Sequence, residues 1–161
     1  MSLFPYRIAY AHCDIPCGIY DPHQAQVAVH TIIRMNQLLA EVKPVRQAQG
    51  KRDDETLAEH DIARITHVKE EHGHLLEDEL GTLQNDYFKE EHYKKFANLK
   101  NLLEKATMLS VKTRQNIDMD SAKELLETVM QISEIFYKSK DLESKRVKAP
   151  YPTGLDIVVQ A

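Results

Sequence analysis

Apolar side chains recur at alternating spacings of three and four along much of this chain, and this repeat constrains its fold most. The pattern begins after Asp21-Pro22, where an aspartate can cap free amides and a proline suits the first helical position. It predicts a helix that ends at Lys43-Pro44, because the residue before a proline disfavours helix. The apolar seam is typical of a bundle helix and consists of Ala25, Ala28, Ile32, Met35, Leu39 and Val42.

Two more helices follow with the same kind of pattern. The second is predicted to begin near Asp53-Asp54, whose charges suit a helix N-terminus, and to end at about Gln84. Residues 85–91 are predicted to connect it to a third helix from about His92 to Gln115. The residues expected on their inner faces are Ala58, Ile62, Ile65, His72, Leu76 and Leu83 in the second helix and Phe96, Leu99, Leu103, Ala106 and Leu109 in the third.

A fourth helix is predicted to open at the capping box Ser121-Ala122-Lys123-Glu124. Its expected inner face contains Leu125, Val129, Ile132 and Phe136. The segment 138–148 has five basic and two acidic residues and is interpreted as a solvated, fraying helix end. The prolines that follow exclude a helix, although Leu155 to Val159 could form a short strand.

Composition places these helices in one soluble domain. The 161 residues are 42% hydrophobic and 29% charged, and no apolar run approaches the roughly 20 residues that span a bilayer. The formal net charge of −4 argues against nucleic acid as a partner. That charge also repels an anionic substrate at long range, so local lysines must supply any attraction. Two cysteines do not make a disulfide framework, and we expect a cytoplasmic protein.

The predicted fold is therefore all-α: an antiparallel four-helix bundle with an N-terminal metal-binding hook and an irregular C-terminal tail. Residues 1–11 are interpreted as a short leader that is removed on maturation, because Ala11 is small enough to precede a cleavage site. The hook occupies 12–21, the bundle 22–146 and an extended tail 147–161.

The hook holds both cysteines of the chain within ten residues. Cys13 and Cys17 are four apart around Pro16-Gly18, and His12 directly precedes them. With His12 as an internal residue, the two thiols could bind one metal, form a small disulfide or lie unused in a loop. The spacing matches neither paired zinc knuckles nor the thioredoxin motif.

Cleavage between Ala11 and His12 changes this interpretation. The new α-amine of His12, with a pKa of about 8, becomes an accessible ligand. Together with the backbone nitrogen and thiolate of Cys13, it closes two adjacent five-membered chelate rings, and Cys17 supplies a second sulfur. Two nitrogens and two sulfurs in a plane suit a square-planar ion such as Ni(II), whereas zinc prefers a tetrahedron.

The segment HCDIPCGIYDP, residues 12–22, closely resembles the N-terminal hook of the nickel-containing superoxide dismutases. A second segment, Asp86-Tyr87-Phe88-Lys89 followed by His92, is similar to a downstream segment of that family. The resemblance covers roughly residues 12 to 140. It implies an oxidoreductase, an antioxidant enzyme that converts superoxide to dioxygen and hydrogen peroxide by Ni(II)/Ni(III) cycling. It also implies one nickel ion per subunit, a leader-cleaving protease and a homohexamer.

The resemblance further implies roles for particular residues. The metal ligands would be His12, through its amine and imidazole, Cys13, through its amide and thiolate, and Cys17, through its thiolate. Tyr20 matches a tyrosine that screens the open face of the nickel, and Tyr87 matches a second tyrosine near the site. The backbone of Asp14 would shape the same pocket, and Lys89 would attract the anionic substrate.

Two positions depart from the family pattern. In the family an acidic side chain and an arginine support the axial imidazole. Counting without gaps from His12, the acidic position falls on Ala28. Counting back from Tyr87, the arginine position falls on His72. Because such partners orient and tune metal ligands, redox potential and rate are the properties most affected.

Other functions remain open at this point. His60, His67 and His74 repeat every seven residues, which fits exposed or interfacial bundle positions better than a second metal site, since no Glu-x-x-His pair marks a di-iron centre. A nickel- or copper-binding delivery protein would bind metal without turnover. A structural bundle protein with an incidental disulfide would tolerate loss of Cys13 in every property except redox sensitivity.

Overall fold

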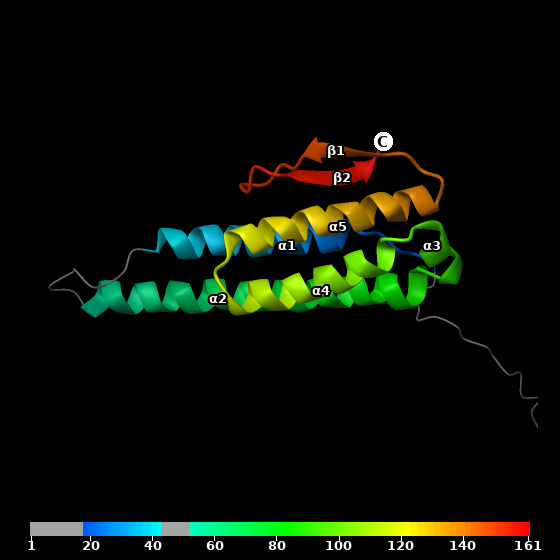
Figure 1. Cartoon of the computed structure of the whole chain (residues 1–161). Coiled ribbons are helices and arrows are strands. Elements are labelled where there is room, and N and C mark those ends of the chain that lie inside the picture. The colour runs from blue at the N-terminus through cyan, green and yellow to red at the C-terminus, as the bar shows by residue number, and fades with distance from the viewer. Residues whose placement is uncertain (1–17, 43–51) are drawn as a thin grey trace, which may run out of the picture.

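The computed structural model describes residues 18–42 and 52–161, with only the backbone for 52–55. Its four long helices run alternately in opposite directions, side by side (Figure 1). They are α1 (His23–Glu41), α2 (Arg52–Thr82), α4 (Leu99–Gln115) and α5 (Met119–Ser139). Helix α1 packs against α2 and α5, and α4 packs against the same two helices. The predicted antiparallel four-helix bundle is confirmed.

Helix α1 begins where its sequence signals predict. The Asp21 carboxylate accepts a hydrogen bond from the His23 backbone N–H at 2.7 Å, so it satisfies one of the free amides of the first turn. The helix ends at Glu41, close to the predicted stop. Because Asp21 is the last residue of the hook, the first turn of α1 fixes the point from which the hook leaves the bundle.

The core lies between the four long helices and contains most of the predicted inward positions. In α5 all four predicted side chains are buried, and in α4 the predicted leucines and Ala106 are buried as well. One expectation is wrong: Ile62 of α2 is 41% exposed. No helix within the described ranges is long and apolar enough to cross a membrane. The largest fully buried apolar side chains are Phe136, Ile32, Ile33, Leu76, Leu80, Leu99, Leu103, Leu125 and Ile132.

The segment between α2 and α4 differs from the prediction. Residues Leu83–Tyr87 extend α2 as a π-helical turn, η2, in which Phe88 N–H bonds to the Leu83 carbonyl at 2.8 Å. A short helix, α3 (Glu90–Lys95), then precedes α4. The predicted single helix from His92 to Gln115 is therefore interrupted. The interruption at Phe96 has a physical reason, because leaving helical geometry lets this half-buried ring pack against the core.

Helix α5 begins earlier than its predicted capping box. Asp118 is the N-cap, and its carboxylate accepts hydrogen bonds from Ser121 N–H at 2.9 Å and from Ser121 Oγ at 2.6 Å. These bonds lower the pKa of Asp118. The prediction that Ser121 opens the helix is wrong because the aspartate three residues earlier captures both of its donors.

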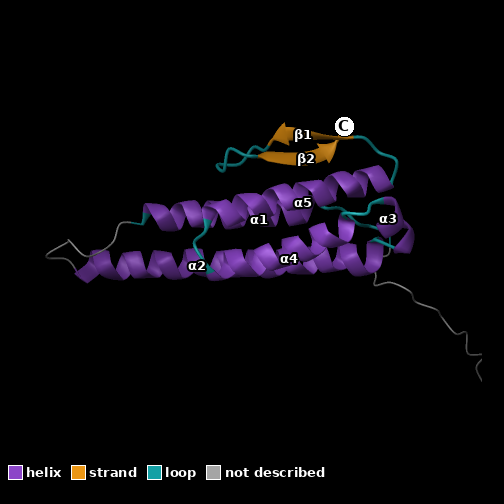
Figure 2. Ribbon diagram, viewed as in Figure 1, coloured by secondary structure: helices purple, strands orange, loops and turns teal. Residues whose placement is uncertain are grey.

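The C-terminal residues form an antiparallel hairpin of β1 (Ser144–Lys148) and β2 (Asp156–Gln160) (Figure 2). Ser144 pairs with Gln160 and Lys148 with Asp156. Strand β1 lies in the segment interpreted as a fraying helix end, so that interpretation is wrong. The tail is also more regular than predicted, and the short strand expected near Leu155 to Val159 is present as β2.

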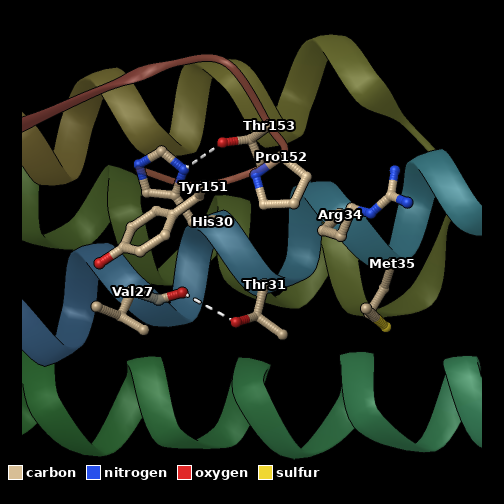
Figure 3. A pocket seen from close by; sticks show the side chains of 8 residues that line it. All are labelled: Val27, His30, Thr31, Arg34, Met35, Tyr151, Pro152 and Thr153. Carbon is tan, nitrogen blue, oxygen red and sulfur yellow. Dashed lines mark hydrogen bonds between the residues drawn. The ribbon is translucent and has the colours of Figure 1, made fainter. Parts of the chain in front are cut away.

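The hairpin is joined to α1 by buried polar groups. Gln26 is fully buried, and its side chain bonds to Val158 twice, Nε2–H to the carbonyl at 3.0 Å and Oε1 to the N–H at 2.7 Å. At the hairpin turn, His30 Nδ1 lies 2.7 Å from Thr153 Oγ1, as Figure 3 shows, and His30 Nε2 lies 3.2 Å from the Asp156 carbonyl. Because a carbonyl can only accept, Nε2 carries the proton and Nδ1 accepts from Thr153.

Candidate functional site

The structure brings together two of the residues predicted to form the site. His12, Cys13, Asp14 and Cys17 lie outside the described residues. Tyr20, at the described end of the hook, contacts Tyr87 with ring centroids 5.6 Å apart and ring planes tilted by 54°. The hook thus leaves the bundle at the end formed by η2 and the C-terminus of α5, which is where the second family-like segment lies.

The π-helical turn η2 determines how Tyr87 enters this end of the bundle. A π-helical turn inserts an extra residue into a helix, and such turns are frequent at functional sites. Here the turn sets Tyr87 half-buried and the adjacent Phe88 fully buried. The Tyr87 ring packs on Phe136 of α5 at 4.7 Å and stacks on His92 at 5.5 Å and 17°. These contacts hold the ring in one orientation beneath the hook.

The Tyr87 hydroxyl has a defined donor direction. Its oxygen lies 2.6 Å from Ser139 Oγ, and Ser139 Oγ donates to the Phe136 carbonyl at 2.7 Å. Since the serine hydrogen is used in that second bond, the Tyr87 O–H donates to Ser139 and keeps its lone pairs free to accept. The Tyr87 phenol can therefore still accept a hydrogen bond.

Lys89 follows the π-helical turn and is exposed. Its backbone N–H donates to His92 Nδ1 at 2.9 Å, which starts α3, and its ammonium group lies 3.5 Å from the Asn85 carbonyl. The side chain therefore folds back over η2, on the same segment as Tyr87. The role of Lys89 as a local positive charge stays a prediction.

Acidic groups lie near Asp21, the residue directly before the first turn of α1. Burial raises the pKa of Glu79, and the nearby carboxylates of Asp78 and Asp21 raise it further. Burial also raises the pKa of Tyr137, again with a contribution from Asp21. Carboxylate groups therefore gather around Asp21, the residue next to Tyr20 of the hook.

One residue that the sequence interpretation missed lies directly at this site. The Lys140 ammonium group is 5.4 Å from the Tyr87 ring centroid and 4.6 Å from that of Phe136. The spacing of four between Phe136 and Lys140 on one helix could have indicated their contact. No sequence signal indicated that Tyr87 would join them, because that contact depends on how α5 packs beside η2.

The two positions that depart from the family pattern provide no carboxylate or guanidinium. Ala28 is fully buried within the core, so its methyl group offers no hydrogen bond to a ligand. His72 is half-buried, and its Nδ1 donates to the Val68 carbonyl of its own helix at 2.8 Å.

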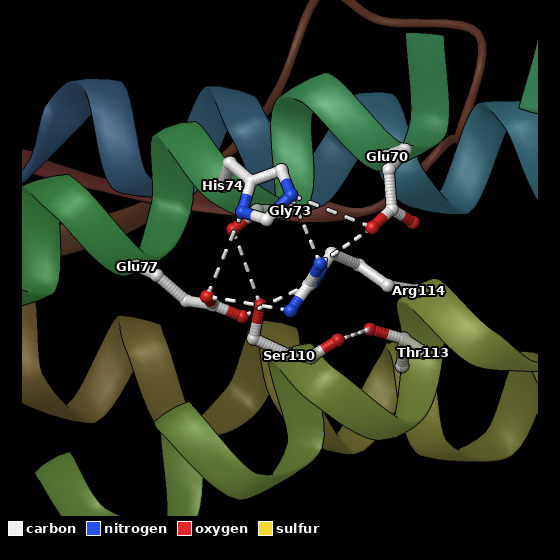
Figure 4. A network of polar contacts seen from close by, with 7 residues as sticks. All are labelled: Glu70, Gly73, His74, Glu77, Ser110, Thr113 and Arg114. Atoms are coloured by element: carbon white, nitrogen blue, oxygen red, sulfur yellow. Dashed lines mark hydrogen bonds and ion pairs between the residues drawn. The ribbon is translucent and has the colours of Figure 1, made fainter. Parts of the chain in front are cut away.

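The repeated histidines of α2 do not form a metal centre. His67 is exposed and lies 3.3 Å from the Glu71 carboxylate. His74 accepts from Arg114 Nη1 at 3.1 Å, and the same guanidinium pairs with Glu70 and Glu77 (Figure 4). Arg114 therefore supplies the positive charge among these groups. Within residues 18–42 and 52–161, no group of three histidine, cysteine or acidic side chains is placed to hold a metal.

The candidate metal ligands are therefore those of the hook. Thiolates and an amine are soft or borderline donors, which suits nickel and copper more than magnesium or calcium. At the described end of the hook, Gly18 has φ of 89°, a left-handed conformation that glycine adopts without steric cost. Tyr20, two residues later, lies beside Tyr87.

Comparisons with known proteins show which family this chain is similar to. A model of the nickel-containing superoxide dismutase family matches residues 7–140. The "Superoxide dismutase [Ni]" of Streptomyces seoulensis is 30% identical over 130 residues, which cover 81% of this chain and 88% of the relative. The corresponding protein of Streptomyces coelicolor is 30% identical over the same shares of the two chains.

Solved structures share the fold as well. The native structure of nickel superoxide dismutase is 28% identical, has a TM-score of 0.65 and covers 80% of this chain and 99% of its own. A structure whose nickel ligation corresponds to the oxidized state has a TM-score of 0.67 at 28% identity, with 81% and 99% covered. The family match ends at residue 140, so the β1–β2 hairpin lies beyond it.

Proposed function

The chain belongs to the nickel-containing superoxide dismutase family, and from this membership we propose that its mature form begins at His12 and disproportionates superoxide. In the overall reaction, two superoxide anions and two protons give one dioxygen and one hydrogen peroxide. The observation that carries the proposal is the hook sequence, followed by a tyrosine that contacts Tyr87 of the second family-like segment. The compartment we expect is the cytoplasm.

The hook residues fit nickel by their chemistry. His12, Cys13 and Cys17 would hold one nickel ion, His12 through its free amine and imidazole and Cys13 through its amide and thiolate. When bound, the nickel supplies one-electron oxidation and reduction between Ni(II) and Ni(III). Thiolates are needed because soft anionic donors stabilise the higher oxidation state. Removal of residues 1–11 by a protease is required because the α-nitrogen of His12 is otherwise an amide.

The remaining site residues control the access of small molecules to the site and the local charge around it. Tyr20 screens the open face of the site, and the backbone of Asp14 shapes the same pocket. The Tyr87 hydroxyl, whose proton points to Ser139, can accept a hydrogen bond from a water or a protonated ligand at the hook. Lys89 attracts the anion in a chain whose formal net charge is −4.

The decisive experiment compares two forms of the protein. One begins at His12, and the other is the full 161-residue chain; both are incubated with Ni(II) and cleared of unbound metal. Superoxide decay is followed by stopped flow, and bound nickel is measured by mass spectrometry of the metal. We expect only the trimmed form to be active. Nickel bound by the trimmed form without superoxide decay would favour the delivery protein.

Two variants distinguish the loss of a metal ligand from a loss of the fold. Cys13→Ser and Cys17→Ser in the trimmed form should lose tight nickel binding and activity while the helical circular dichroism stays unchanged. Equal activity in the untrimmed form would contradict the amine ligand. Intact activity in both cysteine variants would contradict the whole site.

We also propose a homohexamer, which is implied by the resemblance to the family. Such an assembly could cover two exposed apolar side chains of α2, Leu57 at 61% and Ile62 at 41% exposure. Sedimentation equilibrium on the nickel-loaded trimmed protein tests the assembly. A monomer at micromolar concentration would contradict it.

A further inference from the structure

Lys140 occupies the C-terminus of α5 with its charge over the aromatic rings of the site. Its ammonium group lies 4.6 Å from the Phe136 ring centroid and 5.4 Å from the Tyr87 ring centroid. A cation within about 6 Å of an aromatic ring is attracted to its face. The rings therefore hold this charge at the end of the bundle from which the hook emerges.

The backbone around Lys140 is also fixed. The Leu142 N–H bonds to the Tyr137 carbonyl at 3.0 Å, the Asp141 N–H bonds to the Lys138 carbonyl at 3.3 Å, and Asp141 has φ of 55°. This pair of bonds around a left-handed residue is a Schellman motif, which makes Lys140 the C-cap of α5. A lysine here also interacts favourably with the negative end of the helix dipole.

The charge of Lys140 is not cancelled by an ion pair. Among the described residues, no carboxylate oxygen lies within 4.0 Å of its ammonium group, whereas Lys94 and Lys105 pair with glutamates at 2.6 and 2.7 Å. Lys89 has a backbone carbonyl rather than a carboxylate as its neighbour. Two lysines near Tyr87, Lys89 and Lys140, thus have no carboxylate partner among the described residues.

From this placement we propose that Lys140 determines the rate at which the anionic substrate is captured at the site. The inference rests on the proposed superoxide dismutase function and adds to Lys89 a residue from another helix. A unit charge about 10 Å from an anion in water changes its local concentration about twofold, and reversing that charge changes it about fourfold.

The test uses the nickel-loaded protein that begins at His12. Lys140→Gln should lower the second-order rate constant about twofold at an ionic strength of about 0.01 M, and Lys140→Glu about fourfold. Lys140→Arg should keep the wild-type rate. At about 0.5 M salt, where the Debye length is only a few ångström, the variants should converge on the wild type. A loss that persists at high salt would show a structural role and overturn the proposal.

Lys123 is the matched control. It is an exposed lysine on the same helix, and among the described residues no carboxylate pairs with it. It precedes Lys140 by 17 positions, which corresponds to about 25 Å along a helix and exceeds the Debye length of about 8 Å at physiological salt. Lys123→Gln makes the same charge change and should leave the rate unchanged. Equal effects of Lys123→Gln and Lys140→Gln would overturn a local role for Lys140.

A second measurement does not depend on enzyme activity and uses the nickel-free protein. The chain has no tryptophan, so its fluorescence comes from tyrosines, including Tyr20 and Tyr87. Lys140→Gln should reduce quenching by iodide, an anion, relative to quenching by neutral acrylamide, and Lys123→Gln should not. An unchanged ratio would overturn the proposal. Inactive wild-type protein would instead contradict the proposed function, while this quenching comparison would still test the charge.

Discussion

The ring of Tyr20 rests on the ring of Tyr87, with centroids 5.6 Å apart. This contact joins the described end of the hook to the π-helical turn at the end of α2. Tyr87 in turn contacts Phe136 and donates to Ser139, both on α5. Tyr87 therefore links three separate parts of the chain at the candidate site.

Tyr87→Phe should lower the free energy of unfolding by about 1 kcal/mol, because it removes the bond to Ser139 and keeps the ring contacts. Urea unfolding of the nickel-free protein measures the change. Ser139→Ala removes the same bond from the other side. In the double variant the two losses should not add, since both break one interaction; full additivity would mean that the hydroxyl pair is not formed in solution.

Gly73→Ala should destabilise the protein by about 1–2 kcal/mol, although alanine favours helices. A Cβ atom at Gly73 would lie 2.1 Å from Arg114 Cδ and 2.2 Å from Arg114 Cγ, so the arginine would have to leave Glu70 and Glu77. Gly81 in the same helix is the control. Its Cβ would meet nothing closer than Asn85 Nδ2 at 3.9 Å, so Gly81→Ala should stabilise by about 0.5–1 kcal/mol. Thermal unfolding compares the two; a stabilising Gly73→Ala would contradict the packing of Arg114.

Gln26→Leu should cost about 3 kcal/mol, because it leaves the N–H and carbonyl of Val158 buried without partners. The exposed Gln24, two residues earlier, is the matched control and should tolerate the same change. Hydrogen exchange at the Val158 amide gives a local measurement. We expect this amide to exchange faster in Gln26→Leu, and an unchanged rate would show that the hairpin does not depend on Gln26.

Stability should fall as the pH drops below about 6.5, in part because of His30. Burial lowers the pKa of His30 in the folded protein, and its bond to the Asp156 carbonyl opposes this only partly. Below 6.5 the unfolded chain binds this proton while the folded chain does not, so the free energy of unfolding decreases until the pH reaches the lower, folded pKa. Urea unfolding between pH 5 and 7.5 should show a smaller slope in His30→Gln. His60→Gln, at an exposed position, should keep the wild-type slope.

The helical bundle could be predicted from the sequence because its signals are local. Apolar spacing located α1 and α5, and Asp21 marked the start of α1. The hook and the Asp86-Tyr87-Phe88-Lys89 segment led to the family before any contact was known. These are short patterns whose meaning does not depend on the rest of the chain.

The errors concern features that depend on distant contacts. The interruption at Phe96 reflects packing of its ring against the core, and the strand β1 forms only because β2 pairs with it. Lys140 reaches the site because α5 lies beside η2. A polar helix end and a proline-rich tail carry no periodic signal that could reveal such pairings.

The two hydrogen bonds between Gln26 and Val158 connect residues 132 positions apart. During synthesis, Gln26 leaves the ribosome long before Val158 has been added to the chain. The first turns of α1, next to the hook, therefore cannot complete their polar contacts until Val158 has left the ribosome. Protection of the Val158 amide is thus a marker for the moment during synthesis at which the hairpin joins α1.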